Sequence, residues 1–520
     1  MPQAIHSPRP AHRRWKPRRQ VPALLLLTVA LCMVPTVPAY ADPPAAGSPD
    51  FVAIDTHLDR EMRELRIPGL ALGIVHDDEI VHLQAFGVAD ASGRAVTPQT
   101  PFILASASKS FTALAIMQLV EDEKVDLDAP VVTYLPSFSV GDESASTTIT
   151  LRHLLNHTSG LSEDTAYEPM LSNDMSDGAL SERVRALSDA ELVHRPGEAF
   201  EYTDANYDTL GLIVEKVSGQ SYETSIRERI FAPLGMSHSF TDQTDARQSG
   251  LASGHRSWFG FPRSFDAPYS RAAMPSSYLI SSAEDVTHFL IGQLNGGTYD
   301  AASVLSPAGI TAMHQPAVRE GDRDIFYGMG WESRTLAGVP VVRHKGTNAN
   351  FYADMVLDKE GGWGVVILAN FDSLNFNGGR LQGLTAGVLS LLKGEAPPEV
   401  PMPHHPLLAS ATLLIAAVTV LMLSSMFWSL ATMRRWRTHP GRRPGRPWVL
   451  GLRVALSSVV CIGWGLGLLL IFPALAYPLA PTLLIVPDLG YLIVISSVVA
   501  LVWGIARPPL TYITLRRRND

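Results

Sequence analysis

A lysine stands inside an apolar run at residues 102–116, FILASASKSFTALAI, although an ammonium group is rarely buried without a partner. Ser106 lies three residues before Lys109, so the two side chains would share one face of a helix. A serine hydroxyl becomes an effective nucleophile when a neighbouring base takes its proton. A lysine can be that base if burial lowers its pKa, and the apolar surroundings of Lys109 favour this. The pair therefore indicates nucleophilic catalysis, and a lysine on a solvated helical face is the alternative.

Local patterns predict the elements that would position this pair. Apolar residues from Ser106 to about Glu121 predict a helix, and helical patterns recur in ITLRHLLNHTSGLS and in YDTLGLIVEKVSG, which Gly219 closes. Residues 67–90 predict two strands around a turn at residues 77–78. Late strands are expected in VPVVRHKG, FYADMVLD and WGVVILANF. Strands near both ends, with helices between them, predict a sheet built from terminal strands and closed by a helical insertion.

The central part of the chain is strongly acidic. The whole chain has a formal net charge of −8, but residues 21–400 carry about −23, because Lys and Arg are concentrated in residues 1–20 and 401–520. Such a surface argues against a nucleic-acid partner. Both cysteines, Cys32 and Cys461, lie in apolar segments outside this part. The central part therefore holds no disulfide framework, cysteine-based zinc site or cysteine nucleophile.

Residues 1–41 have the layout of a secretory signal peptide. A basic beginning is followed by an apolar core and by the small-x-small sequence AYA at residues 39–41, directly before Asp42. An uncleaved anchor helix is the alternative. Pro35 and Pro38 lie near the end of the apolar run and favour cleavage.

A membrane domain is expected at residues 407–520, after a Pro-rich linker at 395–406. Three apolar stretches there each approach or exceed the roughly 20 residues that cross a bilayer. They lie at about 407–433, 454–477 and 483–506. Arg residues cluster after the first and third stretches, which places both clusters in the cytoplasm. We therefore expect a multi-pass protein of the cell membrane, with a cytoplasmic C-terminus and an exported domain at 42–394.

Several blocks of the exported domain resemble the class C β-lactamase-like serine hydrolases, a group of the β-lactamase-related and penicillin-binding proteins with esterase and D-amino-acid peptidase relatives. The blocks follow the family's order over about residues 50–375. They are IPGLALGIV, FILASASKSFTALAIMQLVEDEKVDLDAPV, ITLRHLLNHTSGL, PGEAFEYTDANYDTLGLIVEKVSGQSY, IFAPLGM, SSAEDVTHFLIGQLNGG, YGMGW and HKGTNANF. The resemblance implies an α/β fold of α+β type: a β-lactamase/transpeptidase-like domain with an antiparallel sheet and a helical subdomain, followed here by three transmembrane α-helices.

The resemblance also implies roles for single residues. Ser106 matches the acyl-accepting nucleophile and Lys109 matches its activating partner. Tyr202, in FEYTDANY, matches the tyrosine of a Tyr-x-Asn element, which shuttles a proton between the nucleophile and the leaving group. The third element is normally Lys-Thr-Gly or His-x-Gly on a strand, and here it is HKG at residues 344–346.

The third element adds groups that would surround the reacting carbonyl. His344 joins the catalytic set, and Gly346 would let substrate backbone approach closely. The backbone amides of Ser106 and Thr347 would form the oxyanion hole, where preorganised donors usually contribute the largest catalytic effect. The resemblance implies no cofactor and no metal.

Two residues depart from the family pattern. Asp204 stands where the family usually has Asn, so a carboxylate that only accepts hydrogen bonds replaces an amide that can donate. A protonated Asp204 and one paired with Lys109 are both open. His344 replaces a permanently charged Lys and would hold a substrate carboxylate weakly near neutral pH. Lys345 is not expected to compensate, because adjacent strand residues point to opposite faces.

Three further patterns each have a structural and a functional interpretation. Ser176, in SDG, offers a rival second element similar to that of class A enzymes, but it stands in a polar, loop-like stretch. His153 and His157 have the i, i+4 spacing of a metal pair, and the resemblance favours structural roles for both. Asp126 and Asp128 are expected in a solvated turn after the helix.

The sequence thus predicts a membrane-anchored serine hydrolase outside the cytoplasm, acting through an acyl–Ser106 intermediate. Its substrate would be an ester, a β-lactam or a D-amino-acid peptide, with cell-wall material as one source. A penicillin-binding-like sensor, acylated slowly and signalling through its membrane helices, is the alternative. A pseudoenzyme scaffold is disfavoured because Ser106, Lys109 and Tyr202 are all present. The sequence leaves the oligomeric state open.

Overall fold

A computed structural model describes residues 49–372, 378–381, 383–399, 406–439, 446–471 and 478–516. The predicted signal peptide at 1–41 lies outside the described residues. The predicted linker at 395–406 is described only in part.

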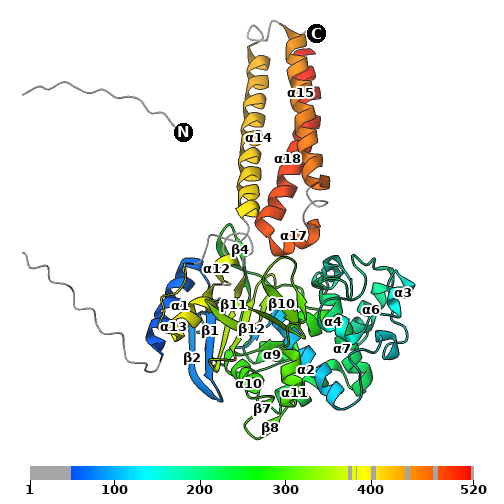
Figure 1. Cartoon of the computed structure of the whole chain (residues 1–520). Helices are drawn as coiled ribbons and strands as arrows, with labels where there is room; N and C mark the ends of the chain where they lie inside the picture. The colour runs from blue at the N-terminus through cyan, green and yellow to red at the C-terminus, as the bar shows by residue number, and fades with distance from the viewer. Residues whose placement is uncertain are drawn as a thin grey trace, which may run out of the picture. The chain divides into compact units, whose positions relative to one another are not determined.

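The centre of the domain that precedes the apolar helices is an eight-stranded antiparallel sheet (Figure 1). Its strand order is β2-β1-β14-β13-β12-β11-β10-β9. The strands are β1 (Gly69–His76), β2 (Glu79–Gly87), β9 (Val318–Arg319), β10 (Ile325–Gly328), β11 (Trp331–Leu336), β12 (Val339–Thr347), β13 (Tyr352–Asp358) and β14 (Trp363–Ala369). The first strand of the chain pairs with the last long one, Leu70 opposite Ala369. The predicted sheet of terminal strands is therefore confirmed.

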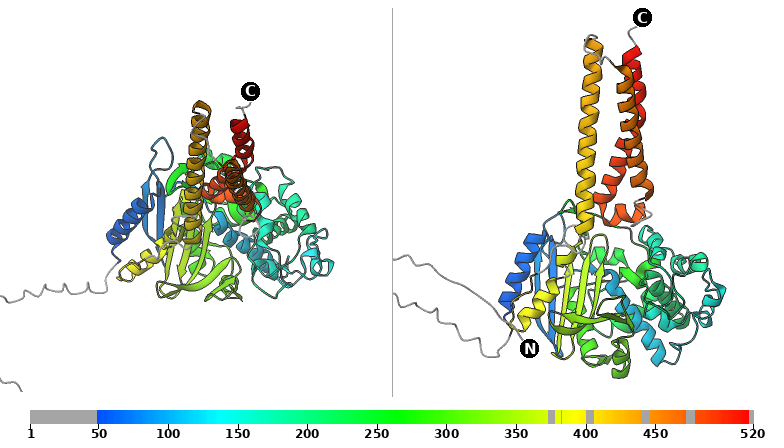
Figure 2. Two further views of the ribbon diagram at one scale, coloured as in Figure 1. Left: turned by 90° about the horizontal axis from the view of Figure 1, so that it is seen from above. Right: turned by 45° about the horizontal axis from the view of Figure 1, so that its top comes forward.

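Each strand at the centre of the sheet alternates its side chains between two cores. Leu70, Leu72 and Ile74 of β1 enter the core formed with α1 (Phe51–Leu65) and α13 (Leu384–Leu392). Ala71 and Val75 enter the larger core on the other face, which α10 (Ala283–Leu294) and the helical subdomain cover. The views in Figures 1 and 2 show α1 and α13 together on one side of the sheet.

The helical subdomain is inserted between β2 and the later strands. Its helices are α2 (Ser108–Glu121), α3 (Glu143–Ser146), α4 (Leu151–Leu155), α5 (Tyr167–Met170), α6 (Ala179–Arg185), α7 (Asp204–Ser218), α8 (Tyr222–Ile226) and α9 (Gln243–Gln248), and α11 (Pro307–Met313) follows α10. Short strands complete the domain: β3 (Phe102–Ile103), β4 (His255–Trp258), β5 (Phe261–Ser264), β6 (Ile280–Ser281), β7 (Thr298–Tyr299), β8 (Ala302–Ser303) and β15 (Phe371–Asp372). A four-residue helix, α12 (Gly378–Leu381), precedes α13.

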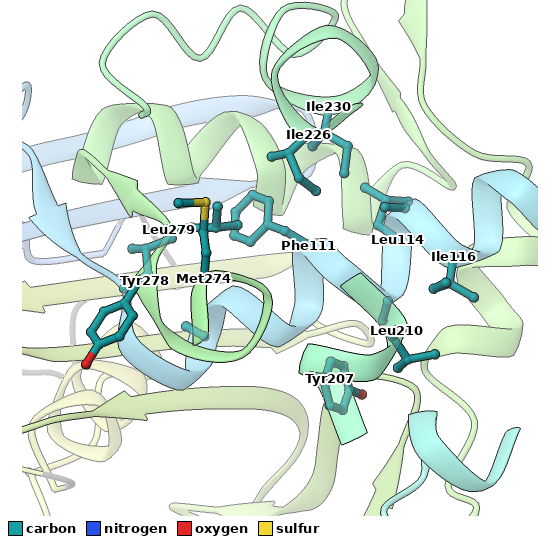
Figure 3. Close-up of a cluster of buried hydrophobic side chains, with 14 of the residues drawn as sticks. Phe111, Leu114, Ile116, Tyr207, Leu210, Ile226, Ile230, Met274, Tyr278 and Leu279 are labelled. Carbon is teal, nitrogen blue, oxygen red and sulfur yellow. The ribbon is translucent and has the colours of Figure 1, made fainter. Parts of the chain in front are cut away.

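Helix α2 is enclosed by protein on every side. Its residues from Ser108 to Leu119 are all buried, which explains why its apolar pattern lacks a single stripe. Figure 3 shows side chains of α2, α7 and α8 gathered with residues 274–279 in one cluster. Helix α7 ends at Gly219, which adopts the left-handed conformation (φ 73°) that a glycine cap predicts.

Among the described residues of the C-terminal part, three helices are long and apolar enough to cross a membrane. They are α14 (Pro406–Thr438), α15 (Pro447–Leu466), which continues through a π-helical turn to Ile471, and α18 (Pro487–Arg516). A short helix, α17 (Leu479–Ile485), precedes the last. The number agrees with the sequence prediction, but the second helix begins earlier than residue 454. The third continues beyond residue 506 and contains Pro508 and Pro509.

Candidate active site

The candidate nucleophile, Ser106, lies in a tight turn directly before α2. The turn is a 3-10 helix at Ala105–Ala107, so Ser106 precedes the regular helix by two residues. Ala105 has a φ of 47°, a left-handed conformation that costs a non-glycine residue free energy. Backbone strain of this kind is concentrated at functional sites, where surrounding packing maintains it.

Strand β12 passes very close to this turn. A Cβ atom at Gly346 would clash with the carbonyl oxygen of Leu104 and would lie 3.0 Å from the amide nitrogen of Ser106. The sequence-based reason for a glycine here was access for substrate backbone. The structure gives a different reason, because the protein's own nucleophile turn occupies that space. Thr347 is the next residue of β12, and its pairing with the Ser106 amide in an oxyanion hole stays a prediction.

Lys109 is completely buried and holds three partners. Its Nζ donates to the Oγ of Ser106 at 3.3 Å, to the Oδ1 of Asp204 at 2.6 Å and to the backbone oxygen of Ser276 at 3.0 Å. Burial alone would lower the Lys109 pKa, but the charge of Asp204 and the contact with Tyr202 outweigh it, so the pKa is raised. The expectation of a lowered Lys109 pKa is wrong in sign, because the sequence did not reveal which carboxylate faces the amine.

Tyr202 lies against the same amine. The Lys109 Nζ is 4.8 Å from the centre of the Tyr202 ring. Burial raises the Tyr202 pKa, and hydrogen bonding to Lys109 and Ser106 opposes this only in part. The ring stacks on that of His157, with centroids 4.3 Å apart. Tyr202 is therefore a neutral phenol in contact with both members of the Ser–Lys pair.

Asp204 is the first residue of α7, where the helix dipole favours a carboxylate. Thr203 caps this helix by accepting from the backbone N–H of Ala205. One Asp204 oxygen accepts from Lys109 and the other accepts from the Ser277 hydroxyl at 3.2 Å. Of the two arrangements left open by the sequence, the structure shows the one paired with Lys109.

His344 projects toward this cluster but is bonded to the protein. Its Nδ1–H donates to the backbone oxygen of Lys345 at 2.9 Å, and its Nε2 accepts from the Tyr327 hydroxyl at 3.1 Å. Burial, aided by the charge of Lys109, lowers the His344 pKa to about 3. Arg343 and Asp354 form an ion pair on the other face of β12, which is also the face of Lys345. The third element therefore presents a neutral imidazole in place of the charged lysine of the Lys-Thr-Gly form.

The other candidate residues lie apart from this chemistry. Ser176 is exposed in a loop. His153 completes a capping box with Thr150 at the start of α4. No group of metal-ligating side chains occurs among the residues that the structure describes. Asp128 forms a two-pronged ion pair with Arg152 in the turn after α2, at 2.6 and 2.8 Å.

Four residues complete the candidate site without having been singled out for it. Ser276 and Ser277 come from a helical turn at Met274–Tyr278 and carry no motif of their own. Tyr327 stands in the YGMGW block, which indicated the family and not a contact to His344. His157 accepts from the Asn206 amide at 3.0 Å and supports the Tyr202 ring. Burial holds the His157 pKa well below its usual range, so the ring is a neutral support.

Comparisons with known proteins identify the family. The family profile described as β-lactamase matches residues 54–388. Protein flp of Staphylococcus aureus (strain MW2) is 30% identical over 323 residues, which cover 62% of this chain and 63% of flp. The chain thus spans a little under two thirds of that relative's length. Penicillin-binding protein 4 of Amycolatopsis lactamdurans is 31% identical over 358 residues, covering 65% of this chain and 91% of that protein.

A solved structure shares the fold. The octameric penicillin-binding protein homologue from Pyrococcus abyssi superposes with a TM-score of 0.58 at 25% identity, covering 71% of this chain and 81% of the other. The roles of the individual site residues stay predictions. The profile match, the relatives and the shared fold together place the chain in the β-lactamase family of serine hydrolases.

Proposed function

We propose that this protein is a membrane-anchored hydrolase that cleaves small esters or amides outside the cytoplasm through an acyl–Ser106 intermediate. The observation that carries the proposal is the buried Lys109 amine, 3.3 Å from the Ser106 hydroxyl and in contact with Tyr202. A lysine so completely enclosed needs a partner, and this one has the nucleophile among its partners. Nucleophile, base and a third orienting group within hydrogen-bond reach are the general signature of covalent catalysis.

The acylation step follows from these contacts. Lys109 is protonated at rest, so the reactive form arises when its ammonium releases a proton to solvent. The neutral amine then takes the Ser106 proton as Oγ forms a bond to the substrate carbonyl carbon. The amides of Ser106 and Thr347 would stabilise the oxyanion. As the bond to the leaving group breaks, Tyr202 gives its proton to that group and recovers one from Lys109.

Deacylation repeats the same steps with water. Lys109 and Tyr202 remove a proton from a water molecule, whose oxygen attacks the acyl carbon of the intermediate. The ester bond to Ser106 then breaks, and the serine oxygen receives the proton. One acid and one alcohol or amine leave in total, and every group returns to its starting state.

The substrate class follows from what surrounds the nucleophile. With its pKa near 3, His344 cannot supply a positive charge for a substrate carboxylate near neutral pH. β-Lactams and D-alanyl peptides carry such a carboxylate next to the bond that is cleaved. Esters or amides with uncharged leaving groups therefore suit this site better than β-lactams do.

A second candidate function is supported by the Lys109–Asp204 ion pair. A lysine held as an ammonium is a poor base, so the acyl–enzyme would be slow to form and slow to clear. A slowly acylated domain attached to several membrane helices has the attributes of a sensor. The exported location rests on the basic clusters that flank the apolar helices and is part of the same proposal.

One kinetic experiment separates the two functions. The full-length protein in detergent is mixed with p-nitrophenyl acetate, and nitrophenolate release is followed from the first turnover. Steady release that is abolished in Ser106→Ala supports the hydrolase. A burst of one equivalent followed by very slow release supports the sensor, and release that survives in Ser106→Ala would contradict both.

A further inference from the structure

The turn of the β4–β5 hairpin contains a residue that its backbone does not favour. Trp258 pairs with Phe261, and the two residues between them form the turn. They are Phe259, at φ 51°, and Gly260, at φ 77°. Turns with two positive φ values favour asparagine, aspartate or glycine at the first position, and the β1–β2 turn has Asp77 there, at φ 53°. A phenylalanine in this conformation costs free energy, so the turn itself does not explain the ring at its tip.

The tip exposes two large apolar side chains. Phe259 is 41% exposed and Phe261 is 52% exposed. No other aromatic side chain is exposed among the described residues that precede α14. Single exposed apolar residues are common on protein surfaces, but neighbouring aromatic rings on a protruding turn indicate a contact with something outside the domain.

One face of the hairpin combines aromatic rings with arginines. Residues that pair directly in an antiparallel ladder share a face, and side chains alternate along each strand. Arg256 pairs with Arg263. The pair Trp258–Phe261 lies two residues further along both strands, so both pairs lie on one face. The guanidinium of Arg66, at the end of α1, lies 4.2 Å from the centre of the Phe261 ring. Aromatic rings beside arginines are typical of a membrane–water interface, where arginine binds phosphate.

The same face meets the beginning of the last apolar helix. The Trp258 ring lies 5.4 Å, between centroids, from that of Tyr491, which stands one turn inside α18. Arg256 donates to the backbone oxygen of Leu483 in α17 at 3.3 Å. The backbone N–H at the tip of the hairpin donates to Asp488, the second residue of α18, at 3.3 Å. The hairpin is therefore held where the apolar segment begins, which is the level of the interface for a helix that spans a bilayer.

We propose that the β4–β5 hairpin is a second contact of the catalytic domain with the membrane. The rings of Phe259 and Phe261 insert into the interfacial layer beside α18, and the guanidinium groups of Arg66 and Arg263 bind lipid phosphate. The wider surface does not supply this attraction, because residues 21–400 carry a net charge of about −23. The inference rests on the membrane anchoring in the proposed function and goes beyond it, since it assigns lipid binding to the domain itself.

Spin labels on single cysteines measure this insertion in the full-length protein. Cys32 and Cys461 are replaced by serine, and the protein is reconstituted into vesicles of phosphatidylcholine and phosphatidylglycerol. A nitroxide is attached in Phe259→Cys or in Phe261→Cys, so that each variant keeps the other phenylalanine. Its accessibility to oxygen, which enters lipid, is compared with its accessibility to a nickel chelate, which stays in water. We expect the oxygen-to-nickel ratio to be severalfold higher at both positions than in the matched control Asp77→Cys, at the same place in the β1–β2 turn.

A charge variant tests the contact with lipid phosphate. Arg263→Gln, made in the Phe259→Cys background, should lower the oxygen-to-nickel ratio of the label, because the hairpin then loses a bond to the headgroup layer. Arg323→Gln, in the exposed turn between β9 and β10, is the matched control and should leave the ratio unchanged. Thermal unfolding of each variant checks that the fold is retained. An unchanged ratio in Arg263→Gln would overturn the assignment of phosphate binding to this arginine.

A label on α14 distinguishes the inference from the proposed function. Val420 is exposed near the middle of that helix, so Val420→Cys should give a lipid-like ratio. A lipid-like ratio there with a water-like ratio in Phe259→Cys and Phe261→Cys would overturn the inference and leave the membrane anchoring intact. Hairpin labels that neither reagent reaches would also overturn it, because protein and not lipid would then cover the tip. A water-like ratio in Val420→Cys would refute the membrane anchoring, and the inference with it.

Discussion

Replacing Asp204 with asparagine should change the pH at which the enzyme becomes active. The Asp204 carboxylate lies 2.6 Å from the Lys109 amine and raises its pKa, whereas burial acts in the other direction. Two unit charges about 4 Å apart interact by about 4 kcal/mol at an effective dielectric constant of about 20, equivalent to about three pKa units. In Asp204→Asn this attraction disappears, and burial then favours the neutral amine. We therefore expect the Lys109 pKa to fall.

The sign of the kinetic effect follows from the role of Lys109 as base. In the wild type the neutral amine forms only as the pH rises through a raised pKa, so acylation should still accelerate at alkaline pH. In Asp204→Asn the amine is already neutral at lower pH, so the acid limb of the profile should move to lower pH, by up to about three pH units if the whole charge interaction is lost. The assay is the pre-steady-state acylation rate with p-nitrophenyl acetate, an uncharged ester, from about pH 5 to about pH 10.

The control is Asp164→Asn, which removes an exposed carboxylate from the turn that follows Glu163. Thermal unfolding of both variants checks that the fold is retained. An acid limb that stays in place in Asp204→Asn would refute the reasoning, because Lys109 would then not be the base that titrates. A shift of the same size in Asp164→Asn would show that the overall charge of the site, and not the ion pair, controls the pKa.

Three further changes have defined outcomes. Tyr202→Phe should lower kcat by roughly 10²–10⁴-fold and Ser176→Ala should cost little, as steady-state kinetics would show, and the reverse order would favour the class A-like second element. Gly346→Ala should lower both activity and the thermal unfolding temperature, because its Cβ meets the Leu104 carbonyl, and a wild-type-like variant would contradict the close approach of β12. A reporter fused after Asp520 should be active only in the cytoplasm, and periplasmic activity would contradict the topology.

Local patterns were sufficient to predict most of the fold. β-Branched and aromatic residues around the turn at 77–78 predicted the β1–β2 hairpin, the three late strands were also predicted, and the glycine at 219 marked the end of α7. The nucleophile turn was not predicted. Ser106 was expected at the start of the helix, and it lies in a strained 3-10 turn before it. That conformation depends on packing against β12, which comes about 240 residues later in the chain.

The candidate site was also predictable in its local contacts and motifs, but not in its long-range contact. Ser106 and Lys109 are three residues apart, so their proximity follows from local structure, and family motifs indicated Tyr202 and His344. The partner of Lys109 could not be predicted from spacing, because Asp204 lies 95 residues away. That one contact reverses the direction of the Lys109 pKa. Electrostatics between distant segments is therefore where sequence reasoning was weakest.

The central claim, that Ser106 is acylated, can be tested by one labelling measurement. The full-length protein is treated with a fluorophosphonate, digested and analysed by mass spectrometry, with Ser106→Ala alongside. We predict one adduct, on the peptide that contains Ser106, and none in the variant. An adduct on a different residue, or labelling that persists in Ser106→Ala, would contradict the account.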